Sequence, residues 1–136
     1  MDLADVIRKR RSVRKFLDKP VPDLSTIIEM AGKGPSAGAI RGCKVLLTEA
    51  EIAPYEAPVY AVICANPDAY EERYGDRGRN LYALQDATIV GAYLQLLLVD
   101  AGLASCWIGA FREYKIQALM GTDLRPVAVI AIGYEA

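Results

Sequence analysis

The sequence contains no histidine among its 136 residues. Histidine is the side chain most often used for proton transfer near neutral pH, and it is a common zinc ligand. Its absence leaves carboxylates, thiols, lysines or a bound cofactor to carry any chemistry. The three cysteines, Cys43, Cys64 and Cys106, lie far apart, form no Cys-x-x-Cys pair and have no histidine to activate them. No other cluster has metal-ligand spacing, so we expect no metal site and no catalytic side chain in the chain itself.

The sequence also lacks a strong net charge. Its 16 basic and 17 acidic residues give a formal net charge of −1, which does not favour general nucleic-acid binding. The start, Met1–Asp5, is acidic and lacks the basic-then-apolar order of a secretory signal. Unpaired thiols and no such signal predict a cytoplasmic location. The longest apolar stretch is interrupted by polar residues, so we expect no membrane span.

Four apolar runs have the length and composition of strands: Cys43–Thr48, Pro58–Ala65, Leu103–Gly109 and Pro126–Tyr134. Helical spacing or helix-capping residues predict helices after Asp2, after Asp23, over Asp68–Tyr74, from about Asn80 to Ala101 and from about Arg112 to Met120. Strands that alternate with helices predict a single layered α/β or α+β domain over residues 1–136.

The predicted helix from Asn80 to Ala101 carries two apolar stripes. One recurs in steps of three and four from Leu84 to Ala101, and the other includes Ile89, Ala92 and Tyr93. This pattern allows two interpretations of the helix. The helix is either a central core helix covered on several sides, or a core helix whose second stripe forms a dimer interface.

Six of the eight residues from Arg8 to Lys15 are basic. Arginine forks bind phosphate oxygens two at a time, and a serine hydroxyl adds another donor, so Arg10, Ser12 and Arg14 predict an anion site. A solvated helix end with favourable basic residues is an equal alternative. A nucleic-acid patch is a third reading, weakened by the balanced charge and by the lack of interleaved aromatic residues.

Two further segments are candidates for ligand contact. The loop Pro35–Gly42 consists mostly of small residues, which allow close approach of a flat ligand, although such a loop is often an ordinary turn. Cys106–Ala110 ends a predicted strand in a Gly-Ala step, where backbone amides can meet a ligand or simply end the strand. Asp86, inside the apolar helix, is expected to pair with a basic group or to accept from a backbone donor.

Taken in order, these segments resemble the nitroreductase family of flavin mononucleotide (FMN) enzymes. The resemblance is carried by Arg10–Phe16, by Pro35–Gly38, by the stretch from Asp86 to Gly109, and by Ile132–Tyr134. It implies an α+β fold, with three α/β/α layers and a mixed sheet of about four strands around a long central helix. It also implies a homodimer with FMN at the subunit interface. NADH or NADPH would reduce the flavin, and a nitroaromatic, a quinone or a similar acceptor would reoxidise it.

The resemblance also implies roles for individual residues. Arg10, Ser12 and Arg14 would hold the flavin phosphate and ribityl chain, with Arg11 beside them. Pro35, Ser36, Ala37 and Gly38 would flank the flavin ring bound mainly by the other subunit. The amides around Ile108, Gly109 and Ala110 would face the N5 and O4 edge of that ring.

Three departures from the family pattern bear on these roles. Where the family commonly has Asn and then Gln-Pro-Trp, this sequence has Ala39 and then Arg41-Gly42-Cys43, so Arg41 is the candidate to replace a lost side-chain contact. The segment between Thr48 and Pro58 is shorter than usual. The sequence stops at Ala136, which implies a short variant without the family's C-terminal arm. These departures keep open a flavin-binding or flavin-handling protein without robust reductase activity.

Overall fold

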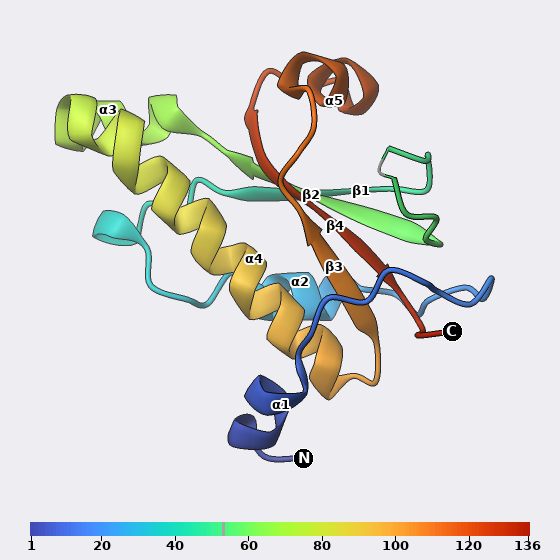
Figure 1. The fold of residues 1–136 in the computed structure, drawn as a ribbon. Coiled ribbons are helices and arrows are strands. Elements are labelled where there is room, and N and C mark those ends of the chain that lie inside the picture. The colour runs from blue at the N-terminus through green and yellow to red at the C-terminus, as the bar shows by residue number, and fades with distance from the viewer. Residues whose placement is uncertain (53) are drawn as a thin grey trace.

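The computed structural model describes residues 1–52 and 54–136, which form a four-stranded sheet with helices on both faces (Figure 1). The strands are β1 (Lys44–Thr48), β2 (Val59–Ala65), β3 (Ala104–Ile108) and β4 (Arg125–Gly133), in the order β1-β2-β4-β3. All three neighbouring pairs are antiparallel. The number of strands is as predicted, but the prediction of a mixed sheet is wrong for these four. β1–β2 and β3–β4 are consecutive strands that return directly beside each other, and β4 also pairs antiparallel with the non-consecutive strand β2.

The helices also follow the predicted order. They are α1 (Leu3–Lys9), α2 (Ser25–Ala31), the short 3-10 turn η1 (Ala37–Ala39), α3 (Pro67–Arg77), the π-helical turn η2 (Gly78–Tyr82), α4 (Ala83–Asp100) and α5 (Glu113–Met120). Asp2 caps α1 as expected, because its Oδ1 accepts a hydrogen bond of 2.9 Å from the amide of Asp5. The helix predicted after Asp23 begins at Ser25, whose amide donates to the Asp23 carboxylate.

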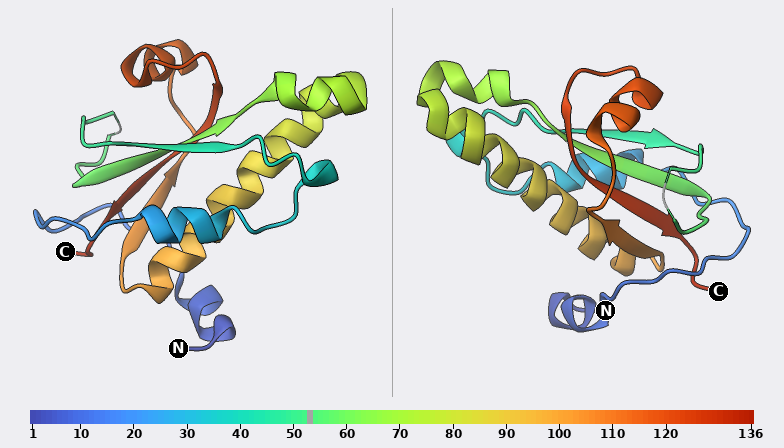
Figure 2. Two further views of the ribbon diagram at one scale, coloured as in Figure 1. Left: turned by 180° about the vertical axis from the view of Figure 1, so that it is seen from behind. Right: turned by 45° about the horizontal axis from the view of Figure 1, so that its top comes forward.

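The core lies on both faces of the sheet, because every residue of β2 is buried. Ala61 and Ile63 pack in the cluster that contains α4 and α2, whereas Tyr60, Val62 and Cys64 pack in the cluster that contains α5. This alternation is the period-two pattern of a strand covered on both sides. The result is the predicted three-layer arrangement, with α4 running across one face (Figure 2).

The helix α4 approaches the sheet closely at Gly91. A Cβ placed on Gly91 would lie 2.6 Å from Cζ3 of Trp107 on β3, so only glycine allows this contact. By length and composition alone, the helical stretch Pro67–Asp100 could cross a membrane. In this fold α4 instead packs against the sheet and buries the polar side chains of Asp86 and Gln95.

The second apolar stripe of α4 lies on the surface of the chain. Ala92 and Tyr93 are exposed, and Leu96 is half-buried. No charged residue occurs on α4 between Asp86 and Asp100. An exposed helix face without charges is typical of a protein interface, which favours the second of the two readings for this helix.

Candidate functional site

The basic segment Arg10–Lys15 meets the edge strand β3 at Ser12 and Val13 and then passes to the end of β4, where the carbonyl of Lys15 accepts a hydrogen bond from the amide of Ala136. The amide of Val13 donates a hydrogen bond of 3.0 Å to the carbonyl of Ser105, and Ser12 forms an isolated parallel bridge with Ser105. The Val13 side chain is buried, whereas Ser12 and Arg14 on either side of it are exposed. One buried residue therefore fixes the segment, and its neighbours present a hydroxyl and a guanidinium to solvent.

The arginines of this segment differ in their partners. Arg11 pairs with the carboxylate of Glu135, and Arg8, just before the segment, pairs with Asp5 at 3.2 Å. Within the described residues, neither Arg10 nor Arg14 has a carboxylate within salt-bridge distance. The guanidinium of Arg14 lies 5.8 Å from the centre of the Tyr55 ring. Arg10 and Arg14 are therefore the arginines of this segment that remain available to bind a phosphate.

The loop Pro35–Gly42 is attached to α4 through the buried carboxylate of Asp86. The Ser36 hydroxyl donates to Oδ2 of Asp86 at 2.5 Å, and the amide of Ala37 donates to Oδ1 at 3.2 Å. The Tyr70 hydroxyl also donates to this carboxylate. Burial raises the pKa of Tyr70 to about 12, and the bond to Asp86 adds to the shift. The sequence predicted the backbone donor for Asp86 but not the two hydroxyl groups.

Arg41 supports the same loop from its other end. Its guanidinium donates to the carbonyl oxygen of Gly32 and, at 3.0 Å, to that of Gly34. Its amide donates to the Ser36 hydroxyl oxygen at 2.9 Å. Arg41 remains a predicted ligand contact, because both carbonyl bonds use Nη1 alone and a guanidinium has further N–H donors.

The loop contains backbone strain. Ala39 has φ of 55° and Arg41 has φ of 54°, in the left-handed region that side chains other than glycine rarely adopt. Each such residue costs about 1–2 kcal/mol relative to an ordinary conformation. Strain of this kind persists only where the surroundings impose it, and it gathers at binding sites.

The third candidate segment, at the end of β3, is open. Ile108 is buried, while Gly109 and Ala110 are exposed. A Cβ placed on Gly109 would meet no other atom within 4 Å. A flat ligand can therefore approach the backbone here closely, as predicted from the Gly-Ala step.

A single chain does not bring all three segments together. A cavity of about 220 Å³ beside the basic segment is lined by Arg11, Val13 and Val99 of α4. The loop instead borders a groove of about 710 Å³, lined by Pro35, Ser36 and Ala37 and by α4 residues from Leu84 to Ile89. Asp86 and Val99 are about 20 Å apart along α4, given the rise of 1.5 Å per residue. That the loop serves a site on another subunit stays a prediction.

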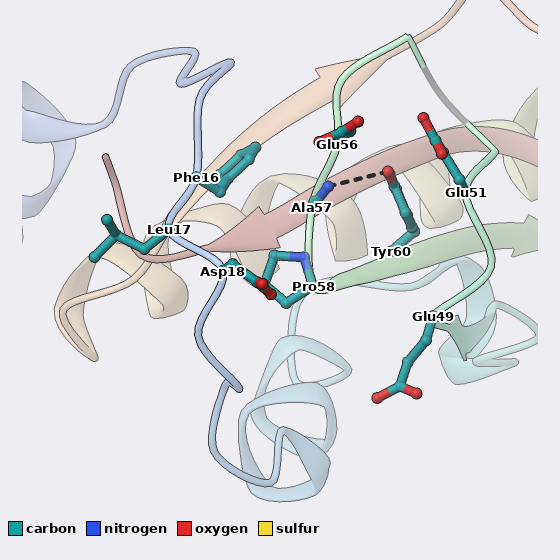
Figure 3. Close-up of a pocket in the computed structure, with 9 residues that line it drawn as sticks. All are labelled: Phe16, Leu17, Asp18, Glu49, Glu51, Glu56, Ala57, Pro58 and Tyr60. Carbon is teal, nitrogen blue, oxygen red and sulfur yellow. Dashed lines mark hydrogen bonds between the residues drawn. The ribbon is translucent and has the colours of Figure 1, made fainter.

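A separate pocket of about 360 Å³ lies at one end of the sheet, between residues 16–18 and the residues that follow β1 and precede β2 (Figure 3). Its lining includes four carboxylates, those of Asp18, Glu49, Glu51 and Glu56. Burial raises the pKa of Tyr60, which also lines the pocket, and Glu51 and Glu56 raise it further. A pocket with this charge repels phosphate. Three carboxylates of the acidic run Glu49–Glu56 therefore form part of a pocket wall, although Ala53 in this run lies outside the described residues.

The described residues also show what the chain offers for metal binding and for thiol chemistry. They contain no group of three or more Cys, Asp or Glu side chains able to hold a metal ion. All three cysteines are unpaired, and Cys64 and Cys106 are buried. Burial raises the pKa of the Cys43 thiol to about 12 and that of Cys64 to about 11, so neither is a thiolate at neutral pH.

Comparison with known proteins finds relatives from one family. A model of the family described as "Nitroreductase family" matches residues 7–54 and 48–134. A Methanothermobacter thermautotrophicus protein, provisionally named an NADH dehydrogenase/NAD(P)H nitroreductase, is 27% identical over 157 residues, which span 100% of this chain and 78% of that protein.

Solved structures have the same fold. A nitroreductase family protein from Clostridium novyi superposes with a TM-score of 0.86 and 28% identity, covering 100% of this chain and 86% of the other. A provisionally named nitroreductase from Desulfovibrio desulfuricans, solved in complex with FMN, superposes with a TM-score of 0.83 and 22% identity. That match covers 100% of this chain and 87% of the other.

Proposed function

The chain belongs to the nitroreductase family, and from this premise we propose that it is an FMN-dependent oxidoreductase. In the proposed reaction NADH or NADPH supplies a hydride, which passes through FMN to a small acceptor such as a nitroaromatic or a quinone. The named relatives support this proposal, since one is a provisional NAD(P)H nitroreductase and another holds FMN.

The observation that carries the proposal is the arrangement along β3. Ser12 bridges to Ser105 of this strand, Arg10 and Arg14 lie two residues before and after Ser12 in the chain, and Gly109 and Ala110 follow the far end of the strand. Two unpaired guanidinium groups and a hydroxyl suit a phosphate dianion. Gly109 leaves the space that a flat ring needs. These residues therefore fit FMN.

The chain's own residues would bind and orient the flavin, and the flavin would supply the hydride chemistry. Arg10 and Arg14 would neutralise the phosphate. The backbone at Gly109 and Ala110 would direct amide donors to one edge of the ring, and the Pro35–Gly38 loop would cover the ring. The absence of histidine and the raised pKa values of Cys43 and Cys64 are consistent with a protein that contributes no nucleophile.

We also propose a homodimer that uses the exposed face of α4. The stripe around Ala92 and Tyr93 continues onto α1, where Leu3 and Ile7 are 67% and 54% exposed. Burying such apolar surface stabilises a dimer by roughly 25 cal/mol per Å². A second copy would bring the Pro35–Gly38 loop of one chain to the basic segment of the other.

Three unpaired cysteines also support the proposal of a cytoplasmic location.

The test is an absorbance spectrum of the purified protein before and after incubation with FMN, followed by anaerobic addition of NADH or NADPH. We expect flavin absorbance, which either donor then bleaches. Protein that takes up no flavin on reconstitution would contradict the proposal. The variant Arg8→Ala serves as a control, because Arg8 already pairs with Asp5.

A second candidate is a protein that binds or carries flavin without robust reductase activity. The engaged guanidinium of Arg41 and the apolar side chain of Ala39 favour it, because they leave the loop few side-chain contacts for a flavin ring. Tight flavin binding without bleaching by either donor would select this candidate.

A further inference from the structure

Two arginines and two tyrosines form a compact cluster at the junction of α3 and η2. We call Arg73, Tyr74, Arg77 and Tyr82 the Arg-Tyr cluster. The rings of Tyr74 and Tyr82 meet edge to face at 5.1 Å. The guanidinium of Arg73 lies 5.3 Å from the centre of the Tyr74 ring, and that of Arg77 lies 5.6 Å from the Tyr82 ring. Such contacts hold a guanidinium in place and leave other N–H groups available.

The charges of this cluster are not neutralised within the described part of the chain. Arg73 and Arg77 are exposed, and no described carboxylate lies within salt-bridge distance of either. Arg73 donates to the carbonyl of Gly38 at 3.2 Å, and Arg77 donates through Nε to the Tyr82 hydroxyl at 3.1 Å. The nearby Arg79 differs, since it pairs with both Asp68 and Glu71. The cluster therefore has two cations available to an anion.

The Arg-Tyr cluster adjoins the groove beside the Pro35–Gly38 loop. Tyr82 lines this groove together with the apolar side chains of Leu84 and Ile89. A Cβ placed on Gly38 would lie 2.4 Å from Nη1 of Arg73 and 2.6 Å from the Tyr74 hydroxyl. The cluster is therefore packed directly against the loop that, under the proposed function, flanks the flavin ring.

We propose that Arg73 and Arg77 bind the pyrophosphate of the reduced nicotinamide dinucleotide that donates electrons. The inference rests on the proposed function. It places the electron donor on the side of the site formed by the Arg-Tyr cluster and the neighbouring groove. A dinucleotide carries two adjacent phosphate charges, which two guanidinium groups of one cluster can pair with. Its flat rings suit the tyrosine faces and the apolar floor of the groove.

The other charged surfaces favour this assignment. Arg10 and Arg14 are already assigned to the flavin phosphate. The pocket lined by Asp18, Glu49, Glu51 and Glu56 would repel a pyrophosphate. Neutral acceptors such as quinones carry no charge for an arginine to recognise. The donor is therefore the substrate whose chemistry needs these two cations.

Steady-state kinetics of the flavin-loaded protein test the assignment with two donors. NADPH carries the pyrophosphate, whereas 1-benzyl-1,4-dihydronicotinamide has the same reactive ring and no phosphate. We expect Arg77→Gln to raise the KM for NADPH about tenfold or more, the range for a lost bond to a charged group. The benzyl donor should retain its kcat/KM within about twofold, and Arg73→Gln should behave as Arg77→Gln does. The matched control is Arg79→Gln, which removes an arginine that already has acidic partners.

Binding of ADP-ribose, measured by calorimetry, gives a readout that does not depend on turnover. We expect the wild type and Arg79→Gln to bind ADP-ribose with equal affinity and Arg77→Gln to bind it about tenfold more weakly. Equal binding by Arg77→Gln and Arg79→Gln would overturn the assignment, as would an equal loss of rate with both donors. A failure of the proposed function is distinguishable, since it would appear as absent flavin uptake in the wild type.

Discussion

The hydroxyl of Ser36 donates a 2.5 Å hydrogen bond to the carboxylate of Asp86, a residue fifty positions later in the chain. This bond joins the small-residue loop to the first turn of α4. Tyr70, from α3, donates to the same carboxylate, so three elements meet at one buried charge. A buried carboxylate is stable only when hydrogen-bond donors surround it, and here the donors come from the loop that it positions. The shape of the candidate ligand loop therefore depends on a residue that need not touch the ligand.

Replacing Asp86 with alanine should destabilise the protein by about 2–4 kcal/mol, because it leaves two buried hydroxyl groups and an amide without their acceptor. Asp86→Asn keeps an acceptor oxygen and should cost less. Urea unfolding measures both. Asp100→Asn, at the exposed end of α4, is the control and should change stability by less than about 0.5 kcal/mol. A small effect of Asp86→Ala would mean that the loop does not depend on this carboxylate.

Replacing Ala39 with asparagine should stabilise the protein by about 0.5–1 kcal/mol. Ala39 has φ of 55°, and asparagine tolerates this left-handed conformation better than alanine because its side chain bonds the local backbone. The same substitution at Ala118, an exposed position inside α5, should instead destabilise, because asparagine is a poorer helix former than alanine. Chemical unfolding of the two variants checks the opposite signs. A loss of stability at both positions would show that the loop backbone is not strained at Ala39.

Much of the fold could be predicted from the sequence because its signals are local. The four apolar runs and the long periodic helix correspond to β1–β4 and α4, and the cap at Asp2 lies where expected. Strand direction depends on long-range pairing, so the expectation of a mixed sheet was wrong. The helix predicted after Asp23 also begins where expected, since the Ser25 amide donates to the Asp23 carboxylate.

The residue types of the candidate site could be predicted from the sequence. The groups with which those residues form salt bridges or hydrogen bonds could not. The freedom of Arg10 and Arg14 depends on where Glu135 and Asp5 lie, which the sequence does not reveal. The engagement of Arg41 with Gly32 and Gly34 depends on the positive-φ turn between them. The Arg-Tyr cluster was missed altogether. Its spacing of arginines and tyrosines over Arg73–Tyr82 is a sequence signal that could have indicated it.

Replacing Arg14 or Arg10 with alanine should weaken FMN binding by about 1.5–3 kcal/mol, the range for hydrogen bonds to charged groups. Both guanidinium groups lack a described acidic partner, so each is free to pair with the phosphate. Flavin fluorescence titration gives the dissociation constants. Arg8→Ala should leave FMN affinity unchanged. If both Arg10→Ala and Arg14→Ala also bind FMN as the wild type does, the phosphate lies elsewhere.

Replacing Ala92 with arginine should dissociate the proposed dimer. Ala92 is exposed in the middle of the uncharged face of α4, where an interface would bury the new charge without a partner. We expect the dimer dissociation constant to rise at least about 100-fold, as measured by sedimentation, and FMN affinity to fall with it. Ala118→Arg places the same charge on the exposed face of α5 and serves as the control. A dimer that survives in Ala92→Arg would assign the interface to another surface.

Stability should fall as the pH rises above about 9. Burial raises the pKa of the Cys43 thiol from 9.0 to about 12 and that of Cys64 from 9.0 to about 11. The unfolded chain therefore releases these protons at lower pH than the folded chain does, and alkaline conditions favour unfolding. The contribution of each thiol is complete below pH 9 and is lost as the pH rises through its folded pKa, at up to about 1.4 kcal/mol per pH unit. Urea unfolding between pH 8 and about 10.5 measures the slope. The double variant Cys43→Ser/Cys64→Ala should show a shallower slope, whatever its stability at pH 8, because it has lost two titrating groups. An unchanged slope would assign the alkaline sensitivity to other residues.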